Sequence, residues 1–390
     1  MNKKTTDFST KTSFLACPLF SECGGCEVQK DFHCPPIFLE MKNFFLEEGI
    51  NFSLNEEKLT GWRMRAKLAV RGESANPEIG LFKKGTHDII SIPNCPMHHP
   101  LINGAVKILR ECICKHKITP YHEISSKGDL RYAQFVAQEK SNKIQLTLVF
   151  NAKDDEVLKR PQIASFLQDL SKDDLWHSIW INCNNKASNT IFDDFWFLYF
   201  GEKFLKQQLL DKEIYLHPAS FSQAHFSLFE KLVLSLNEKM DPQKRVVELY
   251  AGIGVIGFSV LEKSSSVICS EINLYAKECF EKTKNMLSEK EKMKISFHTL
   301  SAEGSTYFLR DCEVLIVDPP RKGVDKLVLE AISQSDCLEQ IVYVSCYFSS
   351  FKRDVEFLKS MGWKIDFAEG YLLFPGTNQI EVLCILRKSG

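Results

Sequence analysis

The stretch ELYAGIGVIG, residues 248–257, decides how the second half of the chain folds. Gly252, Gly254 and Gly257 fit the pattern GxGxxG between the strand-like segment RVVEL and a helical pattern, an arrangement that lets a ligand approach the backbone closely. Glu271 ends the next strand-like segment, VICSE, where a carboxylate can accept hydrogen bonds from two ribose hydroxyls. The pattern predicts a nucleotide-type ligand, either a dinucleotide or S-adenosylmethionine.

Strand-like and helical patterns alternate along the chain from about residue 220 to its end. The segments SVICS, EVLIVD and QIVYVS each lead into a helical pattern, which predicts a parallel sheet with helices on both faces. Dinucleotide-binding folds usually open with the glycine motif, whereas here a helix and the segment HPASFSQAH (217–225) come first. We therefore expect an α/β domain over residues 216–390, a Rossmann-like class I S-adenosylmethionine-dependent methyltransferase domain that ends in a β-hairpin around FPGTN.

The first 215 residues look irregular and β-rich. Apolar and polar residues alternate in several segments, which predicts strands at residues 64–72, 131–139, 143–150 and 176–183 in an antiparallel sheet with one solvated face. A short amphipathic helix near residues 36–49, ended by Gly49, is expected to pack on the other domain. We therefore expect residues 1–215 to form a separate α+β domain.

Composition narrows the class of protein. The chain has 390 residues, a formal net charge of −1 and 14 cysteines. The small net charge means that any contact with nucleic acid has to come from a local patch. The N-terminal residues lack the apolar core of a signal peptide, and no run of about 18 apolar residues predicts a membrane span. So many cysteines without an export signal predict a reducing, cytoplasmic location, where thiols stay free or bind metal.

Three side chains at strand ends are candidates for chemistry. Asp318 begins the stiff segment DPPRKG, Cys346 ends the strand QIVYVS, and Glu381 opens the last strand. In a methyltransferase-type sheet the last strand runs antiparallel to the others, so its first residue lies at the edge where the parallel strands end. We expect the three side chains to converge on one pocket, with the thiolate of Cys346 favoured by the start of the following helix.

Such a pocket suits methylation of a pyrimidine at carbon 5. Carbon 5 of uracil is a poor nucleophile until a thiolate adds to carbon 6 and turns the ring into an enolate. Cys346 can supply that thiolate, and Glu381 can act as the base that removes the proton from carbon 5. Enzymes that methylate cytosine in RNA usually carry a cysteine beside the proline of the fourth-strand motif. The motif here, DPPR, has none, which favours uracil.

A separate feature is the cysteine-rich stretch CPLFSECGGC near the N-terminus. Cys17, Cys23 and Cys26 lie within ten residues of one another. From the residues alone, they fit a redox pair, half of a zinc site or three ligands of an iron–sulfur cluster. His98 and His99, which follow a further cysteine in NCPMHH, keep zinc open as an alternative.

As a set, these motifs resemble those of the iron–sulfur-containing RNA uracil-5-methyltransferases, from about Cys17 to Leu386. The resemblance implies a [4Fe–4S] cluster, a cysteine nucleophile, a general base and a set of contacts to S-adenosylmethionine. The implied residues are Cys17, Cys23, Cys26 and Cys95 for the cluster, Cys346 as nucleophile, Glu381 as base, and Gln223, Tyr250, Glu271 and Asp318 for the methyl donor, to which the glycine turn adds Gly252 and Gly254.

The resemblance also implies an RNA partner and no protein partner. The chain is most similar to the short branch that methylates 23S ribosomal RNA, at a uridine of the uracil-747 type. The transfer-RNA branch lacks the cysteine cluster, and the residues before Cys17 are too few for a TRAM domain. Three alternatives stay open: a uridine in another ribosomal or transfer RNA, an RNA-binding relative without turnover, and an NAD-dependent iron–sulfur oxidoreductase.

Departures from the family pattern lie beside the predicted chemistry. Tyr347 follows the nucleophile where the family usually has Asn. The loop FPGTNQIE carries Gly376 and Gln379 where the family usually has histidines. These changes can alter rate or substrate, whereas Cys346 and Glu381 themselves are present.

RNA recognition requires extrusion of the target base, because its carbon 6 is covered in a stack. Seven lysines and arginines between Lys58 and Lys84, interleaved with Trp62 and Phe82, form a local basic stretch. We expect this stretch, including Arg65 and Arg71, to contact phosphates and bases.

Overall fold

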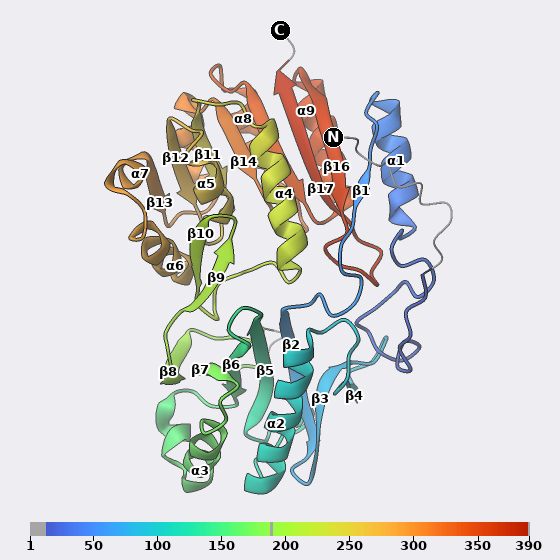
Figure 1. Cartoon of the computed structure of the whole chain (residues 1–390), viewed down its shortest axis with the longest axis vertical. Coiled ribbons are helices and arrows are strands. Elements are labelled where there is room, and N and C mark those ends of the chain that lie inside the picture. Colours follow the sequence, from blue (N-terminus) through green and yellow to red (C-terminus); the bar gives the residue numbers. More distant parts are fainter. Residues whose placement is uncertain (1–12, 188–189, 389–390) are drawn as a thin grey trace.

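A computed structural model gives the structure of the protein and describes residues 13–187 and 190–388. Two α/β parts lie one above the other along the long axis, with the hairpin of β9 (Leu205–Leu209) and β10 (Lys212–Leu216) between them (Figure 1). The upper part is built on an eight-stranded sheet and the lower part on a seven-stranded sheet. No helix among the described residues is long and apolar enough to cross a membrane.

The upper sheet has the arrangement that the alternating pattern predicts. Its strands, in spatial order, are β1 (Leu54–Asn55), β16 (Trp363–Tyr371), β17 (Glu381–Lys388), β15 (Gln340–Ser345), β14 (Val314–Val317), β11 (Arg245–Leu249), β12 (Ser266–Ser270) and β13 (Ile295–His298). The strands from β15 to β13 are parallel. β17 runs antiparallel to both β15 and β16, which confirms the predicted terminal hairpin.

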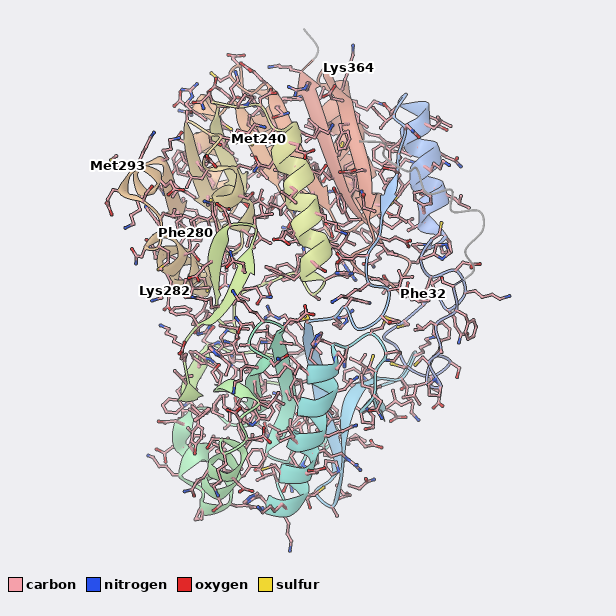
Figure 2. The ribbon with its side chains drawn as sticks, in the orientation of Figure 1. Phe32, Met240, Phe280, Lys282, Met293 and Lys364 are labelled. Carbon is pink, nitrogen blue, oxygen red and sulfur yellow. The ribbon has the colours of Figure 1, made fainter. Side chains whose placement is uncertain are left out.

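Helices cover both faces of the upper sheet, because its central strands are apolar on both sides. One core contains α4 (Phe226–Lys239), α5 (Val255–Val260) and α6 (Leu274–Lys284), and the other contains α1 (Ile37–Glu47), α8 (Lys326–Ser333) and α9 (Phe348–Ser360). α7 (Glu289–Lys294) and a 3₁₀ helix (Glu303–Asp311) complete this part. Side chains fill both cores and the region between the sheets (Figure 2).

The N-terminal helix belongs with the upper part of the molecule. The ring centroids of Phe44 in α1 and Phe348 in α9 lie 5.5 Å apart, edge to face. β1 follows α1 in the chain and pairs with β16. Residues 37–55 therefore belong to the upper part, although they precede the strands of the lower sheet in the sequence. The domain boundary near residue 215 stays a prediction.

The lower sheet contains the four strands predicted in the first half of the chain, each within one residue at both ends. Its spatial order is β4 (Ile89–Ser91), β3 (Asn76–Phe82), β2 (Arg65–Glu73), β5 (Leu130–Gln138), β6 (Lys143–Phe150), β7 (Trp176–Cys183) and β8 (Phe195–Gly201). α2 (Pro100–His116), α3 (Pro161–Leu170) and a 3₁₀ helix (Asp155–Lys159) pack over one face of it.

The expectation of an antiparallel lower sheet with one solvated face is wrong in two respects. β6 and β7 are parallel, because α3 carries the chain back across the sheet between them. The second face is also covered, and the rings of Trp180 on this face and His217 lie 4.5 Å apart. Polar side chains of this face, such as Gln145 and Thr147, are consequently buried.

Arg65 of β2 ties the covered face of the lower sheet to the segment that leads into α4. Its guanidinium donates to the carbonyl oxygens of Pro218 (3.0 Å) and Ser220 (2.7 Å), and twice to Gln134 Oε1. No described carboxylate lies within 4.0 Å of it. Burial therefore lowers the pKa of Arg65 to about 10.

We expect Arg65→Met to destabilise the protein by about 3 kcal/mol, because several buried acceptors lose a charged donor. Arg110→Met is the matched control, since Arg110 donates to Asn76 and to the carbonyl of Pro77 near the surface. Urea unfolding of both variants measures the difference. Equal midpoints would contradict the anchoring role of Arg65.

Candidate active site and cysteine pocket

The glycine turn joins β11 to α5 at the carboxyl edge of the upper sheet. Glu248 of β11 is buried and accepts the backbone N–H of Gly257 (2.9 Å), and burial raises the pKa of Glu248 to about 8. A Cβ at Gly257 would lie 2.6 Å from Glu248 Oε2, and one at Gly254 would lie 2.6 Å from the ring of Phe280. These two glycines permit close packing, whereas a Cβ at Gly252 would meet open space.

A cavity of about 670 Å³ borders the turn at the ends of the parallel strands. It is lined by nearly all the donor-binding and catalytic residues predicted from the sequence: Gln223, Tyr250, Gly252, Glu271, Asp318, Cys346 and Glu381. Gly254 is the exception, since it lies outside the lining and packs on Phe280. The structure thus brings the predicted donor contacts and the predicted catalytic groups into one site.

Glu271 and Tyr250 shape the part of the cavity beside the glycine turn. The Glu271 carboxylate accepts the backbone N–H groups of Gly252 (3.1 Å) and Asn273 (2.9 Å), which hold it in place. The Tyr250 hydroxyl donates to Asp325 Oδ2 (3.0 Å) and accepts the N–H of Asp325 (3.1 Å). A fixed carboxylate at the end of the second strand is the arrangement that binds ribose hydroxyls in such sheets.

Asp318, Cys346 and Glu381 meet where β14 and β15 end and β17 begins. The Glu381 side chain is 0% exposed, and neither carboxyl oxygen has a hydrogen-bond partner among the described residues. Burial and the nearby Asp318 raise the pKa of Glu381 well above its usual range. Burial also raises the pKa of Asp318 to about 7. Buried polar groups rarely lack a partner, so this carboxyl is poised for a ligand in the cavity.

Cys346 is a protonated thiol at neutral pH in this environment. Burial raises its pKa to about 12, and the carboxyl groups of Glu381 and Asp318 add to the rise, while Arg321 opposes it. The start of α9, which we expected to favour the thiolate, does not bring the pKa of Cys346 down to neutral pH. Burial and two nearby carboxyl groups outweigh the helix dipole.

Residues around the catalytic groups include some that sequence reasoning missed. Arg321 Nη2 donates to Gln379 Oε1 (3.0 Å), which links the DPPR segment to the loop before β17. Phe221 lines the cavity although it is 63% exposed, and its place two residues before Gln223 was the available signal. Tyr347, the residue after the nucleophile, is 41% exposed and lies outside the lining.

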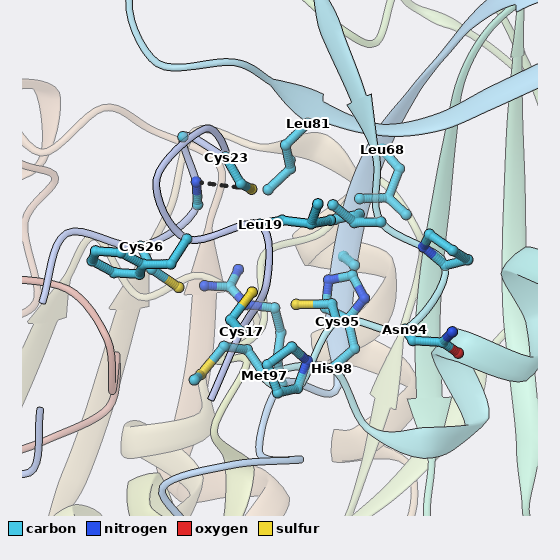
Figure 3. Close-up of a pocket in the computed structure, with 18 of the residues that line it drawn as sticks. Cys17, Leu19, Cys23, Cys26, Leu68, Leu81, Asn94, Cys95, Met97 and His98 are labelled. Carbon is cyan, nitrogen blue, oxygen red and sulfur yellow. Dashed lines mark hydrogen bonds between the residues drawn. The ribbon is translucent and has the colours of Figure 1, made fainter. Parts of the chain in front are cut away.

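Cys17, Cys23, Cys26 and Cys95 line a second cavity, of about 590 Å³. Figure 3 shows these cysteines around a common space, three from the N-terminal loop and one from the loop after β4. In the part of the chain that the structure describes, no three of their sulfurs lie within 4.8 Å of one another. One tetrahedral zinc ion with bonds of about 2.3 Å would hold thiolates roughly 3.8 Å apart. The four sulfurs therefore share a cavity without forming a compact three-thiol group among the described residues.

The histidines beside Cys95 do not supply a compact zinc site. His98 lines the cysteine cavity, and burial lowers its pKa to about 4, which keeps it neutral. His99 caps α2, where its Nδ1 accepts the N–H of Leu101 (3.3 Å). Cys34 lies outside the cavity and packs against the core that contains α1.

Cys112, His116 and Asp169 bring three other ligand atoms within 4.8 Å of one another. Asp169 already pairs with Lys115 (2.6 Å) and contacts His116 Nε2 (3.1 Å). The carboxylate charge is therefore balanced by a lysine.

The basic stretch between Lys58 and Lys84 is only partly available to RNA. Arg65 and Arg71 are turned inward, and each donates to backbone carbonyl oxygens. Trp62 is 2% exposed and cannot stack on a base. The expectation of RNA contacts from these three side chains is wrong, and the exposed lysines of the stretch remain candidates.

Comparison with known proteins identifies relatives of this chain. A family model described as tRNA (Uracil-5-)-methyltransferase matches residues 40–389. An RNA methyltransferase of Protochlamydia amoebophila is 43% identical over 384 residues, which cover 98% of this chain and 100% of that protein. An RNA methyltransferase of Fusobacterium nucleatum is 28% identical over 319 residues, which cover 79% of this chain and 66% of that protein.

A solved structure has a similar fold. It is the crystal structure of the Pyrococcus abyssi tRNA (uracil-54, C5)-methyltransferase in complex with S-adenosyl-L-homocysteine, with a TM-score of 0.72 and 24% identity. The match covers 89% of this chain and 82% of that chain. It confirms the mixed α/β architecture expected from the sequence.

We expect the pKa of Cys346 to move in opposite directions in two variants. At pH values above the raised pKa of Glu381, Glu381→Gln removes a negative charge and lowers the pKa of Cys346, whereas Arg321→Gln removes a positive charge and raises it. Alkylation of Cys346 across a pH series, followed by peptide mass spectrometry, measures the shift, because the rate changes about tenfold per unit of pKa below the midpoint. Shifts of the same sign in both variants would contradict the arrangement of charges.

Proposed function

The chain belongs to the RNA (uracil-5-)-methyltransferase family, whose reaction is methylation of carbon 5 of uracil in RNA, and we propose that it transfers the methyl group of S-adenosylmethionine to a uridine of the uracil-747 type in 23S ribosomal RNA. The observation that carries the proposal is the meeting of Asp318, Cys346 and the unpartnered Glu381 carboxyl in the cavity beside the glycine turn.

Cys346 and Glu381 divide the chemistry between them. The thiolate of Cys346 adds to carbon 6 of uracil, and the ring electrons move onto the carbonyl oxygen at carbon 4, which gives an enolate. S-adenosylmethionine supplies the electrophilic methyl group that carbon 5 of this enolate accepts. Glu381 then removes the proton from carbon 5, the double bond between carbons 5 and 6 forms again, and the thiolate leaves.

The charges of the site favour catalysis only when the methyl donor is present. Burial holds both Cys346 and Glu381 in their uncharged forms. A positive charge nearby favours the ionised form of each, as Arg321 already does for Cys346. The sulfonium of the methyl donor carries such a charge, so donor binding lowers the pKa of both groups, and the thiol and carboxyl protons pass to solvent before the reaction.

The donor contacts follow from the shape of the same cavity. We assign the ribose hydroxyls to Glu271, because its carboxylate is held at the end of the second parallel strand. Gly252 supplies open backbone beside it. Gln223 and Tyr250 complete the proposed donor site, and Gly254 supports the turn from behind through Phe280.

A [4Fe–4S] cluster is the proposed occupant of the cysteine cavity, with Cys17, Cys23, Cys26 and Cys95 as ligands. The meeting of four cysteines in one cavity, with no compact three-thiol group among the described residues, supports a cluster. The proposed role of the cluster is structural, because it joins the N-terminal loop to the segment around Cys95.

Transfer RNA is the second candidate substrate. The cysteine set favours the 23S branch, whereas the solved structure of similar fold is that of a tRNA (uracil-54, C5)-methyltransferase. An NAD-dependent oxidoreductase would leave Asp318 and Glu381 without a role. A relative without turnover would bind the donor and RNA but leave the RNA unmodified.

We expect the protein to form 5-methyluridine in 23S ribosomal RNA taken from a strain that lacks the gene, with labelled S-adenosylmethionine as donor. Cys346→Ala is expected to abolish the product, because no nucleophile then activates carbon 5. Glu381→Gln is expected to lower turnover about 10²- to 10⁴-fold, the usual contribution of a general base. Mass spectrometry of RNA fragments identifies the nucleotide.

Transfer RNA from the same strain is the parallel substrate in this experiment. Methylation of transfer RNA alone would replace the proposed substrate while leaving the chemistry intact. Donor binding without methylation of either RNA would refute the proposed activity and support the relative without turnover.

We expect the protein purified without oxygen to contain about four iron and four sulfide ions per chain. Cys95→Ser is expected to lose most of this iron, because it removes the only ligand outside the N-terminal loop. Cys34→Ser is the matched control, since Cys34 lies outside the cavity. Stoichiometric zinc in place of iron would contradict the assignment.

A further inference from the structure

Residues 374–380, the loop between β16 and β17, lie between the two cavities. Phe374 lines the cavity that contains Asp318, Cys346 and Glu381, which we call the active cavity. Phe374 also packs on the apolar group around the cysteines, which includes Leu15 and Trp62. Pro375 lines the cysteine cavity. Gln379 lines the active cavity again, two residues before the proposed base. One short loop therefore borders both sites.

Gly376 attaches this loop to residues 26–28, which we call the seat of the loop. Its carbonyl oxygen accepts the backbone N–H groups of Glu27 (2.7 Å) and Val28 (3.0 Å). Its φ is +89°, and an added Cβ would lie 3.2 Å from Cys26 Sγ. Glycine thus permits both the turn and the close approach to a cysteine that lines the pocket.

Asn378 adds two further contacts to the seat. Its backbone N–H donates to Glu27 Oε2 (3.2 Å). Its side-chain Oδ1 accepts the N–H of Ile37 at the start of α1 (2.8 Å), where Pro36 provides no side-chain cap. The loop is held by the residues that follow Cys26 in the chain and by the first turn of α1.

We infer that Gly376 is a positioning residue for Glu381, because the seat formed by residues 26–28 holds the loop from which β17 and its first side chain begin. Filling the cysteine cavity fixes this seat and therefore the place of the base. Cys346 is carried by β15 and α9, which do not rest on the seat. The inference rests on the proposed function, and it predicts a selective effect on the step that Glu381 performs.

RNA with 5-fluorouridine at the target separates that step from the earlier ones. The Cys346 thiolate adds to carbon 6 and carbon 5 accepts the methyl group, as in uridine. Carbon 5 then carries fluorine where Glu381 would remove a proton, so the bond between Cys346 and carbon 6 persists. Adduct formation reports on the nucleophile and the donor, whereas turnover on uridine also requires the base.

We expect Gly376→Ala to lower kcat on uridine RNA about ten- to hundredfold, because small displacements of a catalytic group have effects of this size. The rate of adduct formation with 5-fluorouridine RNA is expected to stay within about twofold of wild type. Gly362→Ala is the matched control: its φ is +88°, and an added Cβ meets nothing within 4 Å. It carries a similar backbone strain without the contact to Cys26 and is expected to retain both rates.

Glu27→Ala tests the same seat without adding an atom, and the exposed position of Glu27 makes folding of this variant secure. We expect a smaller loss of kcat with adduct formation retained. If Gly376→Ala fails to fold, as judged by circular dichroism, kcat and the rate of adduct formation of Glu27→Ala test the inference in its place. Loss of turnover and adduct together in Glu27→Ala would refute selective positioning.

Hydrogen exchange gives a readout that does not depend on activity. Backbone amides of residues 376–382 are expected to exchange more slowly in the iron-loaded protein than after chelation of iron, in the wild type. Equal exchange in the two states would overturn the inference. A wild-type protein that forms neither adduct nor 5-methyluridine would refute the proposed function instead, whereas equal kcat in Gly376→Ala and Gly362→Ala would refute the positioning role alone.

Discussion

The insertion of β17 between β15 and β16 is the constraint on which the active cavity depends. Because β17 runs antiparallel to β15, its first residue lies at the edge where the parallel strands end. Val382 pairs with Ser345, so Glu381 comes beside Cys346, which follows Ser345. A shift of this register by one residue would turn Glu381 to the other face of the sheet. The hairpin therefore determines whether Cys346 and Glu381 share a pocket.

The same insertion explains the electrostatics of the site. Asp318, Cys346 and Glu381 meet in one cavity, and the pKa of each is raised, so that each is held in its uncharged form more strongly than in solution. Burial of a carboxyl without a partner is unfavourable, and protonation lessens that cost. A positive charge brought close to these groups would favour their ionised forms.

Two loops of the upper part depend on the rest of the molecule for their positions. The segment before α4, which carries Gln223, is anchored by Arg65 of the lower sheet. The loop before β17 rests on the residues after Cys26. The catalytic cavity is thus built on one sheet, while elements outside that sheet determine where its walls lie. This division lets the N-terminal half of the chain position the walls of the cavity without lining its chemical groups.

The sequence by itself determined the alternating α/β order, the glycine turn, the terminal hairpin and the convergence of Asp318, Cys346 and Glu381, because strand direction follows from local pattern and connection rules. It also placed four strands of the lower sheet. Only the tertiary structure decided that this sheet is covered on both faces, that Arg65 is internal and that the Cys346 thiol is protonated. Burial and charge at these positions arise from contacts between segments far apart in the chain, so the local sequence pattern cannot predict them.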